Sequence, residues 1–193
     1  LFSQQHQIEQ NMKTALLIID IQNDYFEKGS MTLVGSDKAS NNAKLILERF
    51  RRESLPIIHI QHIANSPKAI FFLPDTKGAE IHHNVKPTGK EKIIVKHYPN
   101  SFRETELLDY LKGERITDLV IFGMMTHMCV DATARAAKDF GFTIILIGDA
   151  CATKDLEING QRVRAEEVQK SFLAALNYSY TTVMFTNDYL KEN

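Results

Sequence analysis

The chain has 193 residues, of which 44% are hydrophobic and 24% charged, and its net charge is −1 at pH 7. This composition is typical of one globular domain with enough apolar surface to fold unaided. A charge so close to zero offers no bulk attraction to nucleic acids or anionic membranes. No apolar run approaches the roughly 20 residues of a membrane span. We therefore expect neither a nucleic-acid partner nor a membrane partner.

The cysteine count and the amino-terminal segment both bear on the location of the protein in the cell. Two cysteines, Cys129 and Cys151, are too few for a disulfide framework, which favours a reducing, cytoplasmic location. The first eleven residues are polar and rich in glutamine, without the apolar core of a secretory signal. We expect residues 1–11 to be a leader or disordered extension and residues 12–193 to form a single folded domain.

Strand and helix patterns alternate along the chain, which indicates an α/β fold with a parallel sheet. Short apolar runs predict six strands, and amphipathic or alanine-rich segments predict helices between them. The expected strands are 13–20, 56–60, 91–96, 119–122, 142–147 and 181–185, and the expected helices are 36–54, 102–111, 130–137 and 165–176. We predict a single-domain, Rossmann-like three-layer fold, with a six-stranded, mainly parallel sheet flanked by helices.

One long irregular stretch, residues 64–90, interrupts this alternation and carries three prolines. A loop of this length in a compact domain is usually functional and often covers a site. Its apolar triplet Phe71, Phe72 and Leu73 has to be buried somewhere. The loop is therefore either a lid over a pocket or part of an interface, and the sequence leaves both open.

Three chemically complementary residues stand at the ends of predicted strands. Asp20 ends the first strand, Lys96 ends the third, and Cys129 lies where residues 119–122 lead into a helix. In an open parallel sheet, ligands bind outside the carboxyl ends of the strands, so the three converge on one edge. A carboxylate, a cation and a thiol suit a base, an electrostatic stabiliser and a nucleophile. Taken singly, the residues have plainer readings as a turn cap, a solvated lysine and a buried thiol.

The position of Cys129 at a helix start is the most informative detail. Unpaired backbone N–H groups and the positive end of the helix dipole favour a thiolate there, as does a nearby lysine. We therefore expect a lowered pKa for the Cys129 thiol.

Five short segments, in order along the chain, resemble the motifs of the isochorismatase-like cysteine hydrolase superfamily, which includes nicotinamidases and N-carbamoylsarcosine amidohydrolases. The matching segments are 17–26, 78–81, 95–96 with 101–102, 123–130 and 148–150. The resemblance covers roughly residues 13–186. It implies that Asp20, Lys96 and Cys129 form a catalytic triad. It also implies a cis peptide between Met124 and Met125, and an oxyanion hole made by the backbone N–H groups of Met125 and Cys129.

Metal binding differs among members of this superfamily. Nicotinamidases carry an Asp-x-His motif after the second strand, plus a further histidine, whereas the corresponding segment here is Gln61-His62-Ile63-Ala64. The remaining histidines near it, His59, His82 and His83, match no standard ligand spacing. We therefore expect no metal and no cofactor.

The sequence predicts an enzyme that hydrolyses an amide-like C–N bond of a small molecule through a thioester. Candidate pocket residues flank the triad in the sequence or lie in the long loop: Tyr25, Phe26, Phe72, Leu73, Phe102 and His127. A non-covalent hydrolase of the isochorismatase kind is an alternative, although true isochorismatases lack a nucleophilic cysteine at the position of Cys129. A catalytically silent binding or scaffold protein is the other. Because relatives are commonly dimers or larger, we expect a homo-oligomer.

Overall fold

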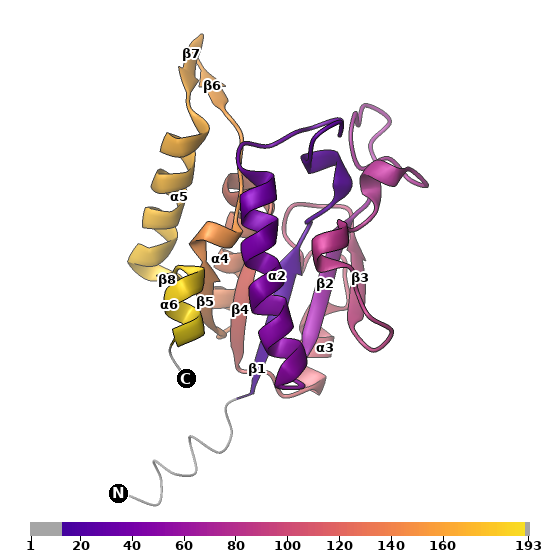
Figure 1. Ribbon diagram of the computed structural model, residues 1–193, viewed down its shortest axis with the longest axis vertical. Helices are drawn as coiled ribbons and strands as arrows, with labels where there is room; N and C mark the ends of the chain where they lie inside the picture. Colours follow the sequence, from indigo (N-terminus) through magenta and orange to yellow (C-terminus); the bar gives the residue numbers. More distant parts are fainter. Residues whose placement is uncertain (1–12, 192–193) are drawn as a thin grey trace, which may run out of the picture.

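A computed structural model describes residues 13–191 of the chain (Figure 1). The leader expected at residues 1–11 lies outside the described residues. Within them the chain forms one sheet with helices on both faces, plus a small separate hairpin. None of the described helices is long and apolar enough to cross a membrane.

The sheet has six parallel strands in the order β3-β2-β1-β4-β5-β8. The strands are β1 (Thr14–Ile19), β2 (Ile57–His62), β3 (Lys92–Lys96), β4 (Asp118–Gly123), β5 (Thr143–Ile147) and β8 (Thr182–Met184). Strands β1 and β4 lie at the centre, and their near-continuous apolar runs are buried on both faces, as a parallel sheet requires. The predicted fold class, a six-stranded parallel sheet flanked by helices, is confirmed.

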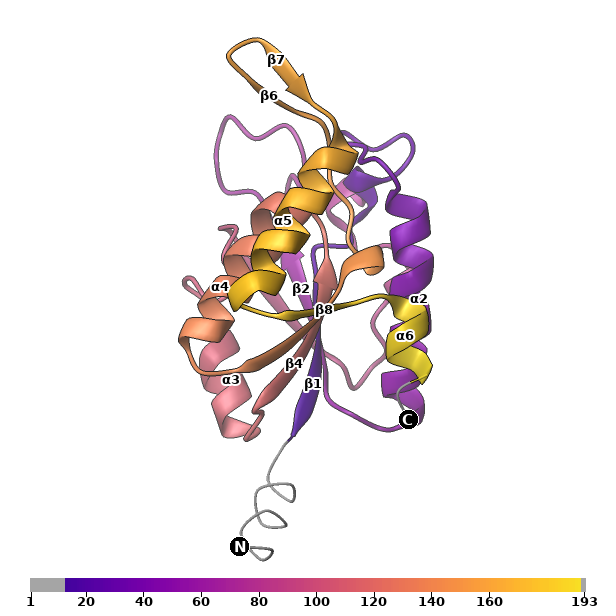
Figure 2. The same cartoon turned by 90° about the vertical axis from the view of Figure 1, so that its left-hand side faces the viewer.

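Helices cover both faces of the sheet (Figure 2). They are α2 (Ser36–Arg52), α3 (Leu107–Gly113), α4 (Asp131–Asp139), α5 (Ala165–Ser179) and α6 (Thr186–Lys191). Figure 2 shows α2 and α6 on one side of the sheet and α3, α4 and α5 on the other. Helix α2 packs a stripe of buried residues, including Ala43, Ile46 and Phe50, against the sheet.

Three elements differ from the sequence prediction. Helix α3 begins at Leu107, because the preceding residues from 97 onward form turns. A short hairpin, β6 (Leu156–Ile158) and β7 (Gln161–Val163), protrudes from the body (Figures 1 and 2). Its turn is Asn159-Gly160, with both residues at positive φ, which is a strong hairpin signal. Helix α6 is also absent from the prediction.

A close approach between β1 and β4 shapes the edge of the sheet where the site lies. A Cβ atom on Gly123 would lie 2.0 Å from the carbonyl oxygen of Ile19, so only glycine fits there. The next residue, Met124, donates its backbone N–H to that same oxygen at 2.9 Å. The chain leaving β4 is therefore held directly beside the residue that follows β1.

The long loop 64–90 is packed against its own domain rather than extended from it. It contains two short 3₁₀ turns, Lys77–Ala79 and His83–Val85. The carboxylate of Asp24 anchors it, since Oδ2 of Asp24 accepts the backbone N–H of Phe72 at 2.6 Å. The Phe72 side chain is fully buried, so the loop carries its own apolar anchor.

Candidate active site

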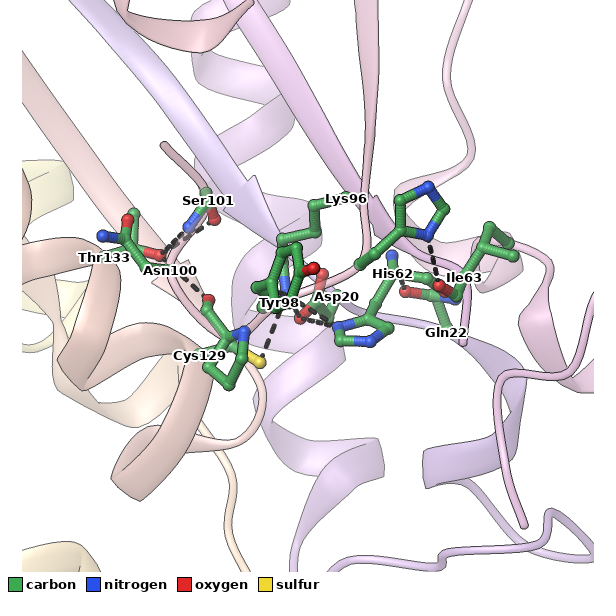
Figure 3. A network of polar contacts seen from close by, with 12 residues as sticks. Asp20, Gln22, His62, Ile63, Lys96, Tyr98, Asn100, Ser101, Cys129 and Thr133 are labelled. Carbon is green, nitrogen blue, oxygen red and sulfur yellow. Dashed lines mark hydrogen bonds and ion pairs between the residues drawn. The ribbon is translucent and has the colours of Figure 1, made fainter. Parts of the chain in front are cut away.

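Four side chains meet at the carboxyl edge of the sheet (Figure 3). Asp20 follows β1, His62 ends β2, Lys96 ends β3, and Cys129 lies in the turn after β4. The Nζ atom of Lys96 is 2.7 Å from Oδ2 of Asp20 and 3.2 Å from Sγ of Cys129. The three residues predicted to converge therefore lie in contact, and both charged side chains are fully buried.

Asp20 occupies an unusual backbone conformation. Its φ is +50°, in the left-handed region that few residues other than glycine, asparagine and aspartate adopt. Its backbone N–H donates to the carbonyl oxygen of Ile60 at 3.1 Å, which ties this bend to β2. Such strained positions persist where the surrounding structure enforces them, and they are frequent at functional sites.

Lys96 is held by four neighbours. Besides Asp20 and Cys129, its Nζ atom lies 2.9 Å from Nδ1 of His62 and 3.0 Å from the backbone oxygen of Tyr98. Burial by itself lowers the pKa of Lys96, but the nearby Asp20 and Cys129 outweigh it and the net pKa is raised. Lys96 is therefore a buried ammonium, and its positive charge is aimed at the carboxylate and the sulfur.

Cys129 lies in a π-helical turn, Thr126–Val130, that leads into α4. The N–H of Val130 donates to the carbonyl of Met125 at 3.3 Å, and such single π turns often mark functional sites. Burial, and secondly Asp20, raises the pKa of the Cys129 thiol well above its usual value. The predicted lowering of this pKa is wrong, because desolvation and the adjacent carboxylate outweigh Lys96 and the helix start.

The segment before Cys129 is fixed from both sides. The peptide bond between Met124 and Met125 is cis. Thr126 donates its backbone N–H to the carbonyl of Ala152 at 3.0 Å, and its hydroxyl lies 2.6 Å from Oε1 of Gln169 on α5. These bonds hold the backbone N–H groups of the turn in a defined position beside the sulfur.

His62 is the site residue that the sequence analysis missed as a participant. Burial, and secondly Lys96, lowers its pKa to about 4, so the imidazole is neutral near pH 7. The side-chain ligand atoms of Asp20, His62 and Cys129 all lie within 4.8 Å of one another. The sequence contained a signal for this role, because His62 ends a parallel strand just as Lys96 does. The group formed by Asp20, His62 and Cys129 differs from the Asp-x-His motif of nicotinamidases.

Two of the predicted pocket residues lie beside this cluster. Tyr25 is buried, and its pKa is raised by that burial and then by the nearby Cys129 and Asp20. The ring of Phe72 lies 4.7 Å from the ring of Tyr25 and 5.7 Å from that of His62. His62 and Phe72 also line a hollow of about 160 Å³ with residues of the long loop.

The other predicted pocket residues have neighbours of their own. Phe102 packs its ring against Phe140 at 5.1 Å. Phe26 stacks on His82 at 3.6 Å. Both belong to the core cluster that also contains Tyr25, Phe72 and Cys129.

Leu73 and His127 are tied to other surroundings as well. Leu73 is 39% exposed and borders a separate hollow beside Asp24. Nδ1 of His127 lies 2.5 Å from the hydroxyl of Thr153. Sequence proximity to the triad suggested these residues for the pocket, and that role stays a prediction.

Comparison with known proteins gives this geometry its context. Residues 14–187 match the model of the isochorismatase domain. The chain belongs to the isochorismatase family. The isochorismatase family protein YddQ of Bacillus subtilis is 49% identical over 180 residues, which cover 93% of this chain and 100% of YddQ.

More distant relatives and solved structures agree with this assignment. A structure described as an isochorismatase hydrolase, from Oleispira antarctica, matches with a TM-score of 0.89 and 42% identity, covering 92% of this chain and 96% of that chain. Nicotinamidase 3 of Arabidopsis thaliana is 27% identical over 157 residues, which cover 75% of this chain and 76% of that protein. The chain is thus an isochorismatase-family hydrolase with relatives that include amidases.

Proposed function

We propose that this isochorismatase-family hydrolase cleaves an amide-like C–N bond of a small molecule through a thioester on Cys129. The observation that carries the proposal is the position of Lys96, whose ammonium bridges the Asp20 carboxylate at 2.7 Å and the Cys129 sulfur at 3.2 Å. A cation in contact with both a nucleophile and a base, at the end of a parallel sheet, completes a set suited to acyl transfer.

The first step is attack of the sulfur on the substrate carbonyl carbon. Because the Cys129 thiol is protonated at rest, a base must take its proton as the S–C bond forms, and Asp20 is the carboxylate in the cluster. Lys96 balances the negative charge on Asp20 before the transfer and on the sulfur during it. The carbonyl π electrons move to the oxygen, giving a tetrahedral intermediate.

The second step is loss of the amine. We place the oxyanion between the backbone N–H groups of Met125 and Cys129, which the cross-links of the π-helical turn keep in a fixed position. The C–N bond breaks as Asp20 returns its proton to the leaving nitrogen. Water then attacks the thioester, with Asp20 again accepting a proton, which releases a carboxylic acid and restores the Cys129 thiol.

The surroundings of the cluster favour a small substrate with a flat or apolar part. Phe72 borders the hollow of about 160 Å³ beside His62, and the ring of Tyr25 packs against that of Phe72. The name of the related nicotinamidase supports an amide as the scissile group.

Two other functions differ from this proposal in how they depend on the thiol. A non-covalent hydrolase of the isochorismatase kind keeps its activity when Cys129 is replaced. A silent binding protein shows no turnover with any substrate. The deciding experiment is a hydrolysis screen over primary amides, lactams, ureido acids and isochorismate, run with the wild type beside Cys129→Ala and, as a matched thiol control, Cys151→Ser.

The expected result is turnover of an amide-type compound by the wild type and by Cys151→Ser, but not by Cys129→Ala. Turnover of isochorismate by Cys129→Ala would favour the non-covalent function. Absence of turnover on every compound, in protein with the expected circular dichroism, would favour the silent one.

We also propose that the enzyme is a cytoplasmic homo-oligomer, at least a dimer. The apolar loop residues Phe71, Phe72 and Leu73 do not support an oligomer, because Phe72 is buried within its own domain. The support comes instead from Val34 and Phe185, which are 62% and 53% exposed and border an apolar hollow of about 470 Å³. Sedimentation of the purified chain at 22.0 kDa at micromolar concentration would contradict the oligomer.

A further inference from the structure

Lys96 lies at the centre of a shell of electron-pair donors. Its Nζ atom is 2.7 Å from a carboxylate oxygen of Asp20, 2.9 Å from Nδ1 of His62 and 3.2 Å from Sγ of Cys129. The backbone oxygen of Tyr98 is a fourth neighbour at 3.0 Å. An ammonium has only three hydrogens to donate. The shell therefore offers one electron-pair donor more than the ammonium can use, and three of its members are side-chain atoms of types that also bind metal cations.

The orientation of His62 follows from this contact. An ammonium only donates hydrogen bonds, so the lone pair of Nδ1 must face Lys96 and the ring proton must sit on Nε2. Figure 3 shows Asp20, His62 and Cys129 turned toward the same point. A carboxylate oxygen, an imidazole nitrogen and a sulfur thus direct their lone pairs at one place.

This donor set matches the preferences of Zn²⁺ and similar thiophilic divalent cations. Zinc takes Cys, His and Asp ligands at about 2.0 to 2.3 Å in a tetrahedral arrangement. The three side-chain ligand atoms lie within 4.8 Å of one another. Each needs to move inward by about 1 Å or less from its present distance to Lys96 to reach zinc-binding distance.

We propose that this cluster is a binding site for Zn²⁺ or a related thiophilic divalent cation, which replaces the Lys96 ammonium and takes Asp20, His62 and Cys129 as ligands. The site is distinct from the Asp-x-His motif of nicotinamidases, which this chain lacks. Within the described residues, it is the one cluster of three or more such ligands with this spacing.

The exchange is balanced in charge. The thiol of Cys129 releases its proton to solvent as the metal–sulfur bond forms, and the Lys96 ammonium turns out of the cluster. Two positive charges, the proton and the ammonium, leave as one dication enters, so the net charge of the buried cluster does not change. The hollow lined by His62 and Phe72 gives a way in, and the His62 side chain is 18% exposed.

Bound metal inhibits rather than assists the proposed hydrolysis, and this part of the inference rests on the proposed function. The metal occupies the lone pairs of both the nucleophile Cys129 and the base Asp20, and it removes the ammonium that stabilises them. Binding itself does not depend on the proposed function, because it requires only the three ligands. The two proposals can therefore fail separately.

The test measures metal binding directly and needs no substrate. Metal-free protein is titrated with Cd²⁺, and thiolate-to-metal charge-transfer absorption in the ultraviolet reports a cadmium–sulfur bond. Zinc affinity is then measured by competition with a chromophoric chelator. We expect one equivalent to bind per chain, with the charge-transfer band present.

Ligand variants assign the site. Changing even the residues that support metal ligands costs 10- to 100-fold in affinity, so Cys129→Ser and His62→Gln should each weaken zinc binding by at least about 100-fold. The matched controls are Cys151→Ser, which removes the other buried thiol, and His97→Gln, which removes the histidine next to Lys96 in the chain. Both controls should bind as the wild type does.

Lys96→Met tests the exchange itself. Removing the ammonium leaves the three ligands without a competitor, so zinc affinity should rise by at least about tenfold. Circular dichroism and thermal unfolding of each variant check that it folds. The proposal is overturned by a missing cadmium–thiolate band, by zinc affinity that Cys129→Ser leaves unchanged, or by weaker binding in folded Lys96→Met. Amide hydrolysis by metal-free enzyme, assayed in parallel, reports on the proposed function alone.

Discussion

Two buried polar clusters border strands β2 and β3, and they differ in how completely their carboxylates are hydrogen-bonded. In the first, Glu91 accepts Nε of Arg51 at 2.7 Å, the backbone N–H of Thr88 at 3.0 Å and a ring nitrogen of His59 at 2.8 Å. In the second, the Asp20 carboxylate faces the Lys96 ammonium but accepts no hydrogen bond from any other described residue. His59 and His62 stand three residues apart on β2, so they point to opposite faces.

The Glu91 cluster serves stability, whereas the Asp20 cluster is available for chemistry. A carboxylate whose lone pairs are all used, like that of Glu91, holds α2 and the loop before β3 against the sheet. A buried carboxylate with spare lone pairs, like that of Asp20, is costly to keep and remains free to accept a proton. The comparison predicts that substitutions in the Asp20 cluster mainly lower turnover, whereas substitutions in the Glu91 cluster mainly lower the free energy of unfolding.

The largest effect is expected on turnover at the Asp20 cluster. Cys129→Ala and Asp20→Asn should each lower kcat by at least about a thousandfold, because nucleophile and base act as a unit. The double variant should be little worse than either single one. Steady-state assays on an amide found in the substrate screen measure this.

The matched control for the first prediction lies in the other cluster. Glu91→Gln removes the carboxylate of the other cluster and should leave kcat within a few-fold of the wild type. Normal turnover in well-folded Cys129→Ala would rule out the covalent mechanism.

The second prediction concerns stability at the Glu91 cluster. Burial alone would raise the pKa of Glu91, but its bonds to Arg51 and Thr88 outweigh that and lower the pKa to about 2. A lowered pKa contributes stability above the ordinary carboxyl value, and that stability is lost as the pH falls from about 4.5 to about 2. Glu91→Gln should therefore lose about 1 to 3 kcal/mol of unfolding free energy at pH 7.

Urea unfolding at several pH values measures this. The gap between the wild type and Glu91→Gln should narrow as the pH falls through that window. A gap that stays constant from pH 7 to pH 3 would show that the charge of Glu91 is not what stabilises the cluster.

A smaller effect is expected on thiol reactivity. Cys129 and Cys151 are about equally buried, at 5% and 6% exposed, so exposure alone predicts equal alkylation. The Cys129 sulfur accepts from Lys96, whereas the Cys151 thiol donates to the carbonyl of Ile147 at 3.4 Å. Because Asp20 can accept the thiol proton and Lys96 can stabilise the charge on the sulfur as the new S–C bond forms, iodoacetamide should label Cys129 at least about tenfold faster.

Lys96→Met sharpens this comparison. It removes the cation beside Cys129 and should slow the labelling of Cys129 without changing that of Cys151. Peptide mapping by mass spectrometry follows both sites in one sample. Faster labelling of Cys151 than of Cys129 in the wild type would contradict the assignment of the nucleophile.

The smallest expected effect is that of chelation. Since the proposed reaction uses only the side chains of the cluster, EDTA should leave the activity unchanged, or raise it in enzyme purified with bound metal. Activity that falls on chelation and returns with zinc or iron would instead support a metal-assisted reaction through His62.

The sequence by itself determined the fold class and the meeting of Asp20, Lys96 and Cys129. Both follow from local information, because apolar runs predict strands and the carboxyl ends of parallel strands share an edge. The pair Asn159-Gly160 is also a sequence signal for a hairpin turn with two residues at positive φ, but the sequence analysis did not predict this hairpin. The catalytic role of the three residues stays a prediction.

Tertiary structure alone decided the electrostatics and the walls of the site. The pKa of the Cys129 thiol is raised because burial and a carboxylate, neither visible in the helix-start pattern, outweigh the dipole. The ring of Phe102 packs against Phe140, a neighbour that the sequence pattern did not predict. His62 joins the cluster because strand register places β2 beside β1 and β3. Desolvation and side-chain packing depend on distant parts of the chain, so local patterns do not specify them.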